Sequence, residues 1–351
     1  MCATKRAGFQ PCMARRGGFD WPRRQWATHG SAEGVFCGQP RVCGSWDGLR
    51  GMRLSPAGAS RRKIRRRSRC EPRSLPYSAH VMTADHVALV TGGGGGIGTA
   101  TSLALAGAGA TVLVSGRDEL RLQASVEAVR SAGGVAHPLC LDVCDGASIR
   151  DAREQALELV GPVDWVVANA GVAISAALTS DEAESVARQQ MDVNYHGARR
   201  VFEAFLPHLL KHGHGRAVMV ASSAALLGYP YITGYAASKH ALLGYARSAA
   251  LELNGKGVGI GVVCPHYVDT PMTDASVARI ADKTGRDHEQ ARAALAELNP
   301  GGKLVEADEV ASVILRLLQS DLSGVVVELT GSEQREIESG LPLVPHSPGG
   351  D

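Results

Sequence analysis

The sequence lacks any run of about 18 uninterrupted apolar residues, the length that would indicate a membrane-spanning helix. Aromatic residues are scarce, at 5% of 351 residues, and charged residues make up only 21%, whereas 44% are hydrophobic and 42 residues are glycine. Such a composition provides ample material for a core and excludes collagen-like, coiled-coil and wholly disordered chains. It is typical of an α/β protein rich in alanine, valine and glycine.

Cysteine is also scarce after residue 81, where only Cys140, Cys144 and Cys264 occur. They form no metal-ligating pattern, so we expect no metal site and interpret them as buried, reduced thiols. Charge divides at the same place. Residues 1–81 carry 17 Lys and Arg against 4 Asp and Glu, whereas the remainder carries 20 against 31. The chain therefore consists of a strongly basic leader followed by an acidic globular part.

The leader, residues 1–81, shows no helical or strand periodicity, and residues 61–69 are its densest basic run. The charges of such a run repel one another, which predicts a disordered tail. Alternatively, the leader is upstream sequence translated from too early a start codon, with Met82 as the true start. Its arginine content leaves an organellar transit peptide open, whereas a nucleic-acid patch has weaker support because no stacking platforms accompany it. We expect a cytoplasmic protein without membrane or nucleic-acid partners, with organellar targeting as the alternative.

From residue 82 onward, valine-rich runs alternate with stretches of helical spacing. This alternation predicts a parallel sheet covered on both faces, a Rossmann-like doubly wound α/β fold in one domain over residues 82–331. Residues 332–351 are rich in Pro, Gly and polar side chains, and we expect them to form a flexible tail. Seven strands are expected, at residues 86–91, 111–115, 139–143, 163–168, 216–221, 258–263 and 325–329.

Five consecutive glycines, residues 92–96, follow the first expected strand and precede a helix of small residues. Glycine removes Cβ atoms that obstruct close approach, and a helix N-terminus directs N–H groups and a positive dipole at an anion. At this position the pattern predicts a dinucleotide phosphate site rather than a mere flexible turn. The second strand is followed by Gly116 and Arg117, where the adenosine ribose should lie. Arg117 would either clamp a 2′-phosphate or be a solvated residue at a helix start.

Residues 235–239, Tyr-Ala-Ala-Ser-Lys, place Tyr235 and Lys239 on one helix face. A free phenol, with a pKa near 10, is a poor base at neutral pH, but a nearby cation and an oxidised nicotinamide would favour its phenolate. Alone, this pair usually means a core tyrosine and a surface lysine. However, an expected strand upstream ends in Ser222 and Ser223, which places a hydroxyl at the ligand-binding edge of the sheet.

Together with residues 168–171 (Ala-Asn-Ala-Gly) and Asn194, these segments resemble the short-chain dehydrogenase/reductase family, in its order and spacing, over residues 85–331. The resemblance implies an NAD(P)-dependent enzyme that interconverts a ketone and a secondary alcohol by hydride transfer, and a homo-oligomer, either a tetramer or a dimer. Local similarity at residues 231–244 and 299–311 indicates 3-oxoacyl or 3-hydroxyacyl thioesters as substrates. Ketosteroids, polyketides and small secondary alcohols stay open, as does a non-catalytic nucleotide-binding scaffold.

The resemblance also implies a role for each of four catalytic residues. Tyr235 is the expected general acid/base, and Lys239 is expected to bind the nicotinamide ribose and lower the pKa of Tyr235. Ser222 would hydrogen-bond the substrate oxygen. Asn194 would hold a water in a proton relay, its alternative being a polar residue that bends a helix.

Cofactor contacts are implied in the same way. Asn169 would fix the strand geometry near the cofactor, and Asp142 would accept a bond from the adenine amino group, unless it is the N-cap of the next helix. The expected cofactor-binding residues are Gly92, Gly96, Ile97, Gly98, Arg117, Asp142, Val143, Asn169, Ala170, Gly171, Tyr235, Lys239 and Thr270.

Four positions bear on specificity. Family members that favour NAD typically have a carboxylate where this chain has Gly116, and Arg117 offers a guanidinium for a phosphate. The basic residue often found in the glycine loop of NADP users is replaced by Gly95, so one cation rather than two supports our expectation that NADP is preferred over NAD. His266 stands where the family usually has glycine after the sixth strand. This departure changes the loop that borders the nicotinamide, either as a tolerated substitution or as a further catalytic group.

Overall fold

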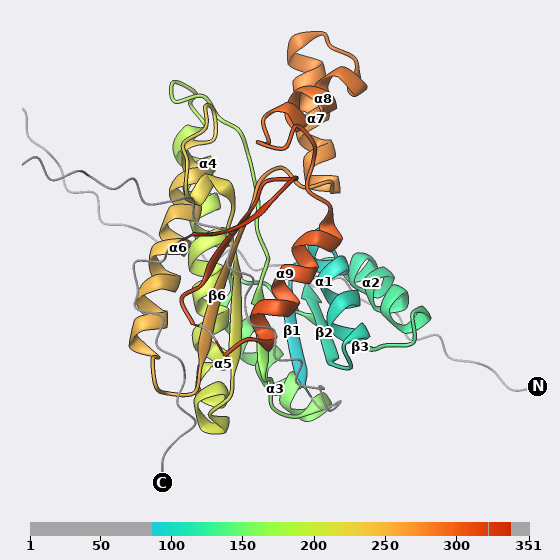
Figure 1. Cartoon of the computed structure of the whole chain (residues 1–351), viewed down its shortest axis with the longest axis vertical. Helices are drawn as coiled ribbons and strands as arrows, with labels where there is room; N and C mark the ends of the chain where they lie inside the picture. The colour runs from blue at the N-terminus through green and yellow to red at the C-terminus, as the bar shows by residue number, and fades with distance from the viewer. Residues whose placement is uncertain (1–85, 322, 338–351) are drawn as a thin grey trace, which may run out of the picture. The chain divides into compact units, whose positions relative to one another are not determined.

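The computed structural model describes residues 86–321 and 323–337, so the basic leader and residues 338–351 lie outside the described part of the chain. One eight-stranded sheet has the strand order β3-β2-β1-β4-β5-β6-β7-β8 (Figure 1). The strands are β1 Val87–Thr91, β2 Thr111–Gly116, β3 Val135–Cys140, β4 Trp165–Ala168, β5 Arg216–Val220, β6 Gly259–Pro265, β7 Val326–Leu329 and β8 Gln334–Ile337.

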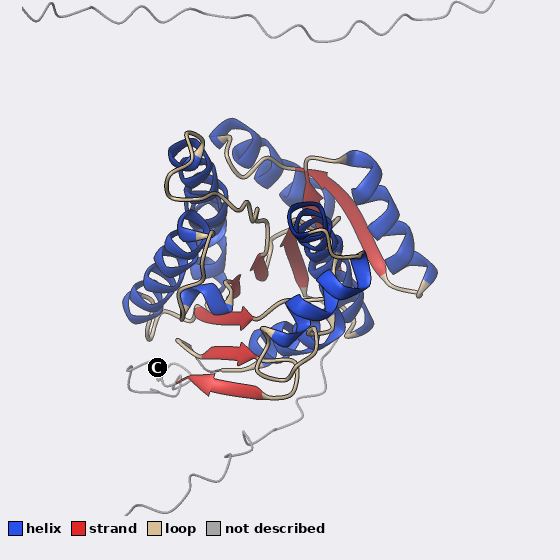
Figure 2. Cartoon of the chain, turned by 90° about the horizontal axis from the view of Figure 1, so that it is seen from above, coloured by secondary structure: helices blue, strands red, loops and turns tan. Residues whose placement is uncertain are grey.

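Helices follow the strands and lie on both sides of the sheet, as the view from above in Figure 2 shows. They are α1 Gly96–Gly107, α2 Glu119–Ser131, α3 Gly146–Val160, α4 Ala183–Met191, α5 Ala198–His212, α6 Thr233–Glu252, α7 Pro271–Thr284, α8 His288–Glu297 and α9 Ala307–Gln319. A π-helical turn, η1 Asp192–Gly197, joins α4 to α5, and a 3-10 turn, η2 Ser223–Ala225, follows β5. No helix of the described residues is long and apolar enough to cross a membrane.

Side chains of the central strands alternate between two apolar cores, one on each face. Ala88 and Val90 of β1 belong to the core that α1, α2 and α9 cover, whereas Leu89 belongs to the core under α3, α5 and α6. Because both faces are covered, these central strands are largely apolar, which is the pattern that predicted them. The prediction of a Rossmann-like doubly wound α/β domain is confirmed.

The chain order of the strands places the functional edge. From β1 the chain adds β2 and β3 on one side, and it then returns to add β4 and all later strands on the other side. The carboxyl ends of β1 and β4 therefore lie at the point where the order reverses, which is where open α/β sheets bind ligands. The glycine run follows β1 there, and Asn169 follows β4.

The third strand differs from our prediction. We expected residues 139–143 because they are the apolar run, but β3 spans Val135–Cys140, pairing Val135 with Thr111 and Cys140 with Gly116 of β2. As an edge strand, β3 is covered less fully, and Val135 is 54% exposed. An edge strand also tolerates Pro138, which has no N–H to donate. Its mixed, proline-containing sequence therefore hid a strand that register with β2 supports.

The end of the sheet differs as well. Seven strands are parallel, as expected, but β8 is an eighth and pairs antiparallel with β7, from Val326↔Ile337 to Leu329↔Gln334. The expected flexible tail includes residues 334–337, because their sequence, Gln-Arg-Glu-Ile, is polar. A polar strand suits an exposed sheet edge. The turn before it is closed by Thr330, whose hydroxyl accepts a hydrogen bond from Glu333 N at 3.0 Å.

Candidate active site

The glycine run forms a tight loop between β1 and α1. Gly92 has φ +63°, in the region that favours glycine, and a Cβ there would lie 2.9 Å from Ala170 Cα. At Gly98 a Cβ would lie 2.2 Å from Gly92 O, so any larger residue would force the loop open. Gly92 and Gly98, two of the expected cofactor residues, are thus in one tight turn, and a third, Ala170 after β4, packs against it.

The N-terminus of α1 is left open by this loop. Its N-cap, Gly95, provides no side chain, and no acidic residue lies in the first turn, which contains Gly96 and Ile97. By contrast, α2, α3 and α8 each begin with an aspartate that accepts a backbone N–H: Asp118, Asp145 and Asp287. The first N–H groups of α1 and its positive dipole end therefore stay available to an anion.

Thr91 and Asn169 fasten the glycine loop to the end of β4. Asn169 Nδ2 donates to Thr91 O at 2.9 Å and to Gly92 O at 3.2 Å. Thr91 Oγ1 in turn accepts hydrogen bonds from the backbone N–H groups of Asn169 and Ala170, each at 3.0 Å. Asn169 therefore joins the glycine loop to the end of β4, and its role beside the cofactor stays a prediction. Thr91 was missed, although its place at the last position of a buried strand, before the glycines, was a usable signal.

Arg117 and Asp142, expected to serve the two ends of an adenosine, face each other. Arg117 Nη1 lies 3.8 Å from Asp142 Oδ2, and the two side chains are 68% and 36% exposed. The other oxygen of Asp142 accepts from Cys144 N at 2.9 Å. Asp142 is not the N-cap of α3, because that position is taken by Asp145. The alternative hypothesis, that Asp142 caps the next helix, is therefore wrong. The carboxylate of Asp142 lies beside Arg117 in the turn after β3.

Two further expected cofactor residues are largely buried in the surrounding packing. Val143 is 6% exposed and packs against Gly197 of η1. A Cβ added at Gly197 would lie 2.6 Å from Val143 Cγ2. Thr270 is the N-cap residue of α7, and its Cγ2 would be 2.6 Å from a Cβ at Gly96. The loop after β6 therefore lies against the glycine loop after β1, and their backbones approach closely because residue 96 is glycine.

Tyr235 and Lys239 lie one turn apart in α6, as their spacing predicted. Lys239 is buried, its Nζ donates to Val220 O at 2.8 Å, and it lies 5.8 Å from the centre of the Tyr235 ring. Burial lowers the pKa of Lys239 to about 8. Burial also raises the pKa of Tyr235 to about 12, although a hydrogen bond with Ser222 opposes this. The low pKa expected for Tyr235 is therefore not found in the chain by itself, because desolvation of the phenolate dominates.

Ser222 lies where β5 ends and is 9% exposed. Its Oγ caps η2 by accepting from Ala224 N at 3.2 Å, which fixes the hydroxyl beside Tyr235. The neighbouring Ser223 hydroxyl instead accepts a 2.9 Å bond from the Tyr229 hydroxyl. Of the two serines, Ser222 is thus the one next to Tyr235, as expected.

Asn194 is fully buried in η1. Its Oδ1 accepts from Val172 N at 2.8 Å, and its Nδ2 donates to Val172 O at 2.9 Å and to Ser238 Oγ at 3.0 Å. A Cβ at Gly171 would lie 3.2 Å from Asn194 Oδ1 and 3.6 Å from Lys239 Nζ. The structure thus brings Asn194, Gly171 and Lys239 together, and Asn194 clamps the backbone that follows β4.

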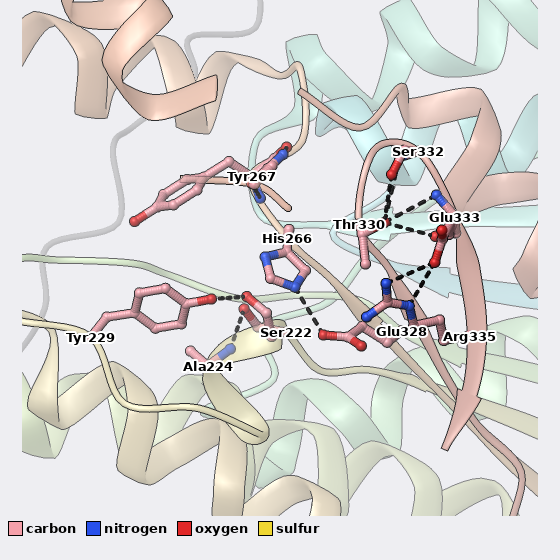
Figure 3. Close-up of polar contacts among 12 residues, drawn as sticks. Ser222, Ala224, Tyr229, His266, Tyr267, Glu328, Thr330, Ser332, Glu333 and Arg335 are labelled. Carbon is pink, nitrogen blue, oxygen red and sulfur yellow. Dashed lines mark hydrogen bonds and ion pairs between the residues drawn. The ribbon is translucent and has the colours of Figure 1, made fainter. Parts of the chain in front are cut away.

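His266, which replaces an expected glycine, has a partner that we did not foresee. Its Nε2 lies 2.9 Å from Glu328 Oε1 on β7, and the side chains are 2% and 14% exposed (Figure 3). A single carboxylate within the buried run Val325–Leu329 was the signal in the sequence, because an unpaired charge is rarely buried. No group of the described residues could hold a metal ion.

The described site combines a free helix N-terminus, a fixed hydroxyl pair and a buried ammonium. A sequence model described as short chain dehydrogenase matches residues 86–281. The 3-oxoacyl-[acyl-carrier-protein] reductase of Thermotoga maritima is 31% identical over 257 residues, 73% of this chain and 98% of that protein. The cyclohexanol dehydrogenase of an Acinetobacter species is 34% identical over 247 residues, 70% of this chain and 91% of that protein.

A solved structure is similar to this chain as well. A variant of actinorhodin polyketide ketoreductase crystallised with NADPH has a TM-score of 0.68 and 29% identity, and the match covers 72% of this chain and 98% of that one. The chain belongs to the short-chain dehydrogenase/reductase family.

Proposed function

We propose that this chain reduces the keto group of a 3-oxoacyl thioester to a secondary alcohol, with NADP preferred over NAD. Membership of the family makes it an NAD(P)-dependent ketone/alcohol oxidoreductase. The observation that carries the proposal is the fixed trio of Ser222, Tyr235 and Lys239 at the carboxyl edge of the sheet. Similarity to a 3-oxoacyl reductase supports the thioester substrate.

The described residues fit a nicotinamide dinucleotide. The N-terminus of α1 has neither a capping side chain nor an acidic residue, so it suits a diphosphate. Arg117 is exposed at the end of β2, the place of the adenosine ribose, which supports a 2′-phosphate there. The remaining expected contacts, from Asp142 and Val143 through residues 169–171 to Thr270, surround the same edge.

The three central side chains divide the proton chemistry. A bound nicotinamide supplies the hydride. Tyr235 holds a proton that it donates to the carbonyl oxygen, and its raised pKa keeps the phenol protonated at neutral pH, as reduction requires. Ser222 Oγ offers the same oxygen a second hydrogen bond. Lys239 places positive charge behind the phenol, which stabilises the phenolate after the proton has left.

Asn194 and Asn169 position this machinery. Asn194 holds Val172 and thereby the backbone beside Gly171 and Lys239. A relay water at Asn194 would share its Oδ1, since a carbonyl oxygen has two lone pairs and Val172 N takes one. Asn169 supports the glycine loop through Thr91 and Gly92, and so acts on the dinucleotide indirectly.

Small cyclic alcohols are the second candidate substrate class, because a cyclohexanol dehydrogenase is 34% identical. Ketosteroids and polyketides would use the same trio. A non-catalytic scaffold is disfavoured, because such a protein has no chemical need for all three of Ser222, Tyr235 and Lys239.

We further propose a cytoplasmic homo-oligomer, a dimer or a tetramer, that acts on a small molecule. A hollow of about 370 Å³ between α5 and α6 supports self-association; among its lining side chains are Phe202, Leu206, Tyr245 and Leu253. Size-exclusion chromatography with light scattering would test this, and a monomer would refute it.

The activity is tested by following consumption of NADPH and NADH with a 3-oxoacyl thioester, a ketosteroid and cyclohexanone. We expect the highest kcat/KM with the thioester and NADPH, and the activity should depend on Tyr235. A Tyr235-dependent preference for cyclohexanone would establish the second candidate instead.

A further inference from the structure

His266 is held rigidly at the carboxyl end of β6. Its backbone N–H donates to Leu329 O at 3.0 Å, which extends the pairing of β6 with β7. Its ring is fixed as well, because Nε2 bonds Glu328 Oε1 at 2.9 Å. The register pairs Cys264 with Glu328, so the carboxylate and the imidazole lie at the edge that also carries Ser222. The imidazole therefore has a single orientation.

The other ring nitrogen has no partner. His266 Nδ1 is buried and makes no hydrogen bond. A carboxylate only accepts, so Nε2 carries a proton, and Nδ1 is left either to accept from a hydroxyl or, in a charged ring, to donate to a carbonyl. Burial without a partner is unfavourable, and native proteins rarely leave such groups unpaired. The unpaired nitrogen thus points to a ligand.

The surroundings of His266 are those of the reacting groups. In Figure 3 the imidazole lies between Ser222 and Tyr267, and its Nδ1 edge faces away from Glu328, on the side where Tyr229 and Tyr267 lie. The rings of these two partly exposed tyrosines are 6.4 Å apart. Burial raises the pKa of Cys264 to about 12, whereas a backbone hydrogen bond with Ser222 and the charge of Lys239 lower it. Because Lys239 acts on Cys264, the same end of β6 also borders the buried ammonium.

We propose that His266, oriented by Glu328, binds a second oxygen atom of the substrate and so selects ketones that carry a carbonyl or hydroxyl near the reacting carbon. This inference rests on the proposed function, because it requires a ketone held by Ser222 and Tyr235. The 1,3 spacing of the two oxygens in a 3-oxoacyl thioester fits the class. Because Nδ1 is closed to water in the chain by itself, the substrate must displace a neighbouring side chain, and Tyr267 is the adjacent one.

The test compares two ketones of equal chain length, ethyl 3-oxobutanoate, which has ester oxygens, and 2-heptanone, which has none. In the His266→Leu variant we expect the ratio of kcat/KM for the oxoester to that for 2-heptanone to fall about 3- to 10-fold, the size of one hydrogen bond. The kcat/KM for 2-heptanone should fall less than that for the oxoester. A merely space-filling histidine would change both substrates alike, and that result, or an unchanged ratio, would overturn the proposal.

Glu328 offers an independent arm. Glu328→Ala frees the imidazole, so the ratio should fall as in His266→Leu, whereas Glu328→Gln keeps an acceptor for Nε2–H and should largely preserve it. The double variant His266→Gly with Glu328→Gln restores the family's glycine without leaving a buried charge. If His266→Leu does not fold, the same kcat/KM ratio is measured with this double variant. His240→Leu, at an exposed position of α6, is the matched control and should leave the ratio unchanged.

The wild-type chain separates failure of this proposal from failure of the function. Equal kcat/KM for both ketones would overturn selection by His266 and leave ketone reduction intact. If the chain reduces neither ketone, or reduces no 3-oxoacyl thioester, the proposed function is refuted and this inference with it.

Discussion

Replacing Arg117 by alanine tests the proposed preference for NADP. In the chain by itself the guanidinium of Arg117 lies 3.8 Å from Asp142, and both side chains are substantially exposed. An ion pair so exposed contributes about 0–1 kcal/mol. Arg117 can therefore leave Asp142 at little cost when a 2′-phosphate binds.

The gain is larger than this cost. A hydrogen bond from a guanidinium to a phosphate is worth about 1.5–3 kcal/mol. Subtracting about 0.5 kcal/mol, the middle of the range for the ion pair, leaves a net preference of roughly 1–2.5 kcal/mol, which corresponds to a factor of about 5 to 70. We therefore expect Arg117→Ala to lower the ratio of kcat/KM for NADPH to that for NADH by about this factor, mainly through the KM for NADPH.

The assay measures initial rates with both cofactors at low ionic strength, since salt screens an exposed contact. Arg188→Ala is the control, because Arg188 is an exposed arginine paired with Glu184 on α4, away from the β2 end. Asp142→Asn removes the competing carboxylate and should raise the ratio by at most about fivefold. Equal losses with NADPH and NADH, or a wild-type preference for NADH, would refute the assignment of Arg117.

Four further outcomes follow from the site and the domain boundary. Tyr235→Phe removes the transferable proton but little volume, so kcat should fall by at least about 100-fold while cofactor affinity, measured by fluorescence titration, is nearly unchanged. Because burial lowers the pKa of Lys239 to about 8, its positive charge is present below that pH and lost above it. The kcat/KM for reduction should therefore fall as pH rises through about 8, and Lys239→Met should remove this pH dependence. Asn169→Ala loses two hydrogen bonds, at 2.9 and 3.2 Å, and should lower the free energy of unfolding by about 1–2 kcal/mol in urea titrations and weaken cofactor binding. A shortened chain beginning at Met82 should keep its melting temperature and kinetics, because β1 begins only at Val87; a drop of several degrees would contradict this.

The buried part of the fold was predictable because burial leaves a clear mark on the sequence. β1, β2 and β5 are continuous apolar runs, and their expected and observed bounds differ by no more than one residue. β3 and β8 were misplaced or missed because edge strands are covered less fully. Their pairing is set by the neighbouring strand, and a single sequence does not record that neighbour.

The candidate site shows the same division. The helix spacing of Tyr235 and Lys239 follows from local geometry and was predictable. The contact of Asn194 with Val172 joins residues 22 positions apart, and the contact of His266 with Glu328 joins residues 62 positions apart. No local pattern specifies such pairs, since strand order and register determine them. The direction of the pKa shift of Tyr235 also depended on burial, which only the assembled domain shows.

The π-helical turn η1 places about one extra residue in the helix from α4 to α5. Its i→i+5 hydrogen bonds make each turn hold about one residue more than an α-helical turn. Deleting one residue from Asp192–Gly197 would therefore let the turn become regular α-helix and would keep the buried stripe of α5 against the sheet; its members are Val201, Phe202, Phe205 and Leu209. We expect such a deletion to be tolerated by the fold and to disturb the placement of Asn194 on Val172, whereas a one-residue deletion inside α5 would turn the stripe by about 100° and should abolish folding.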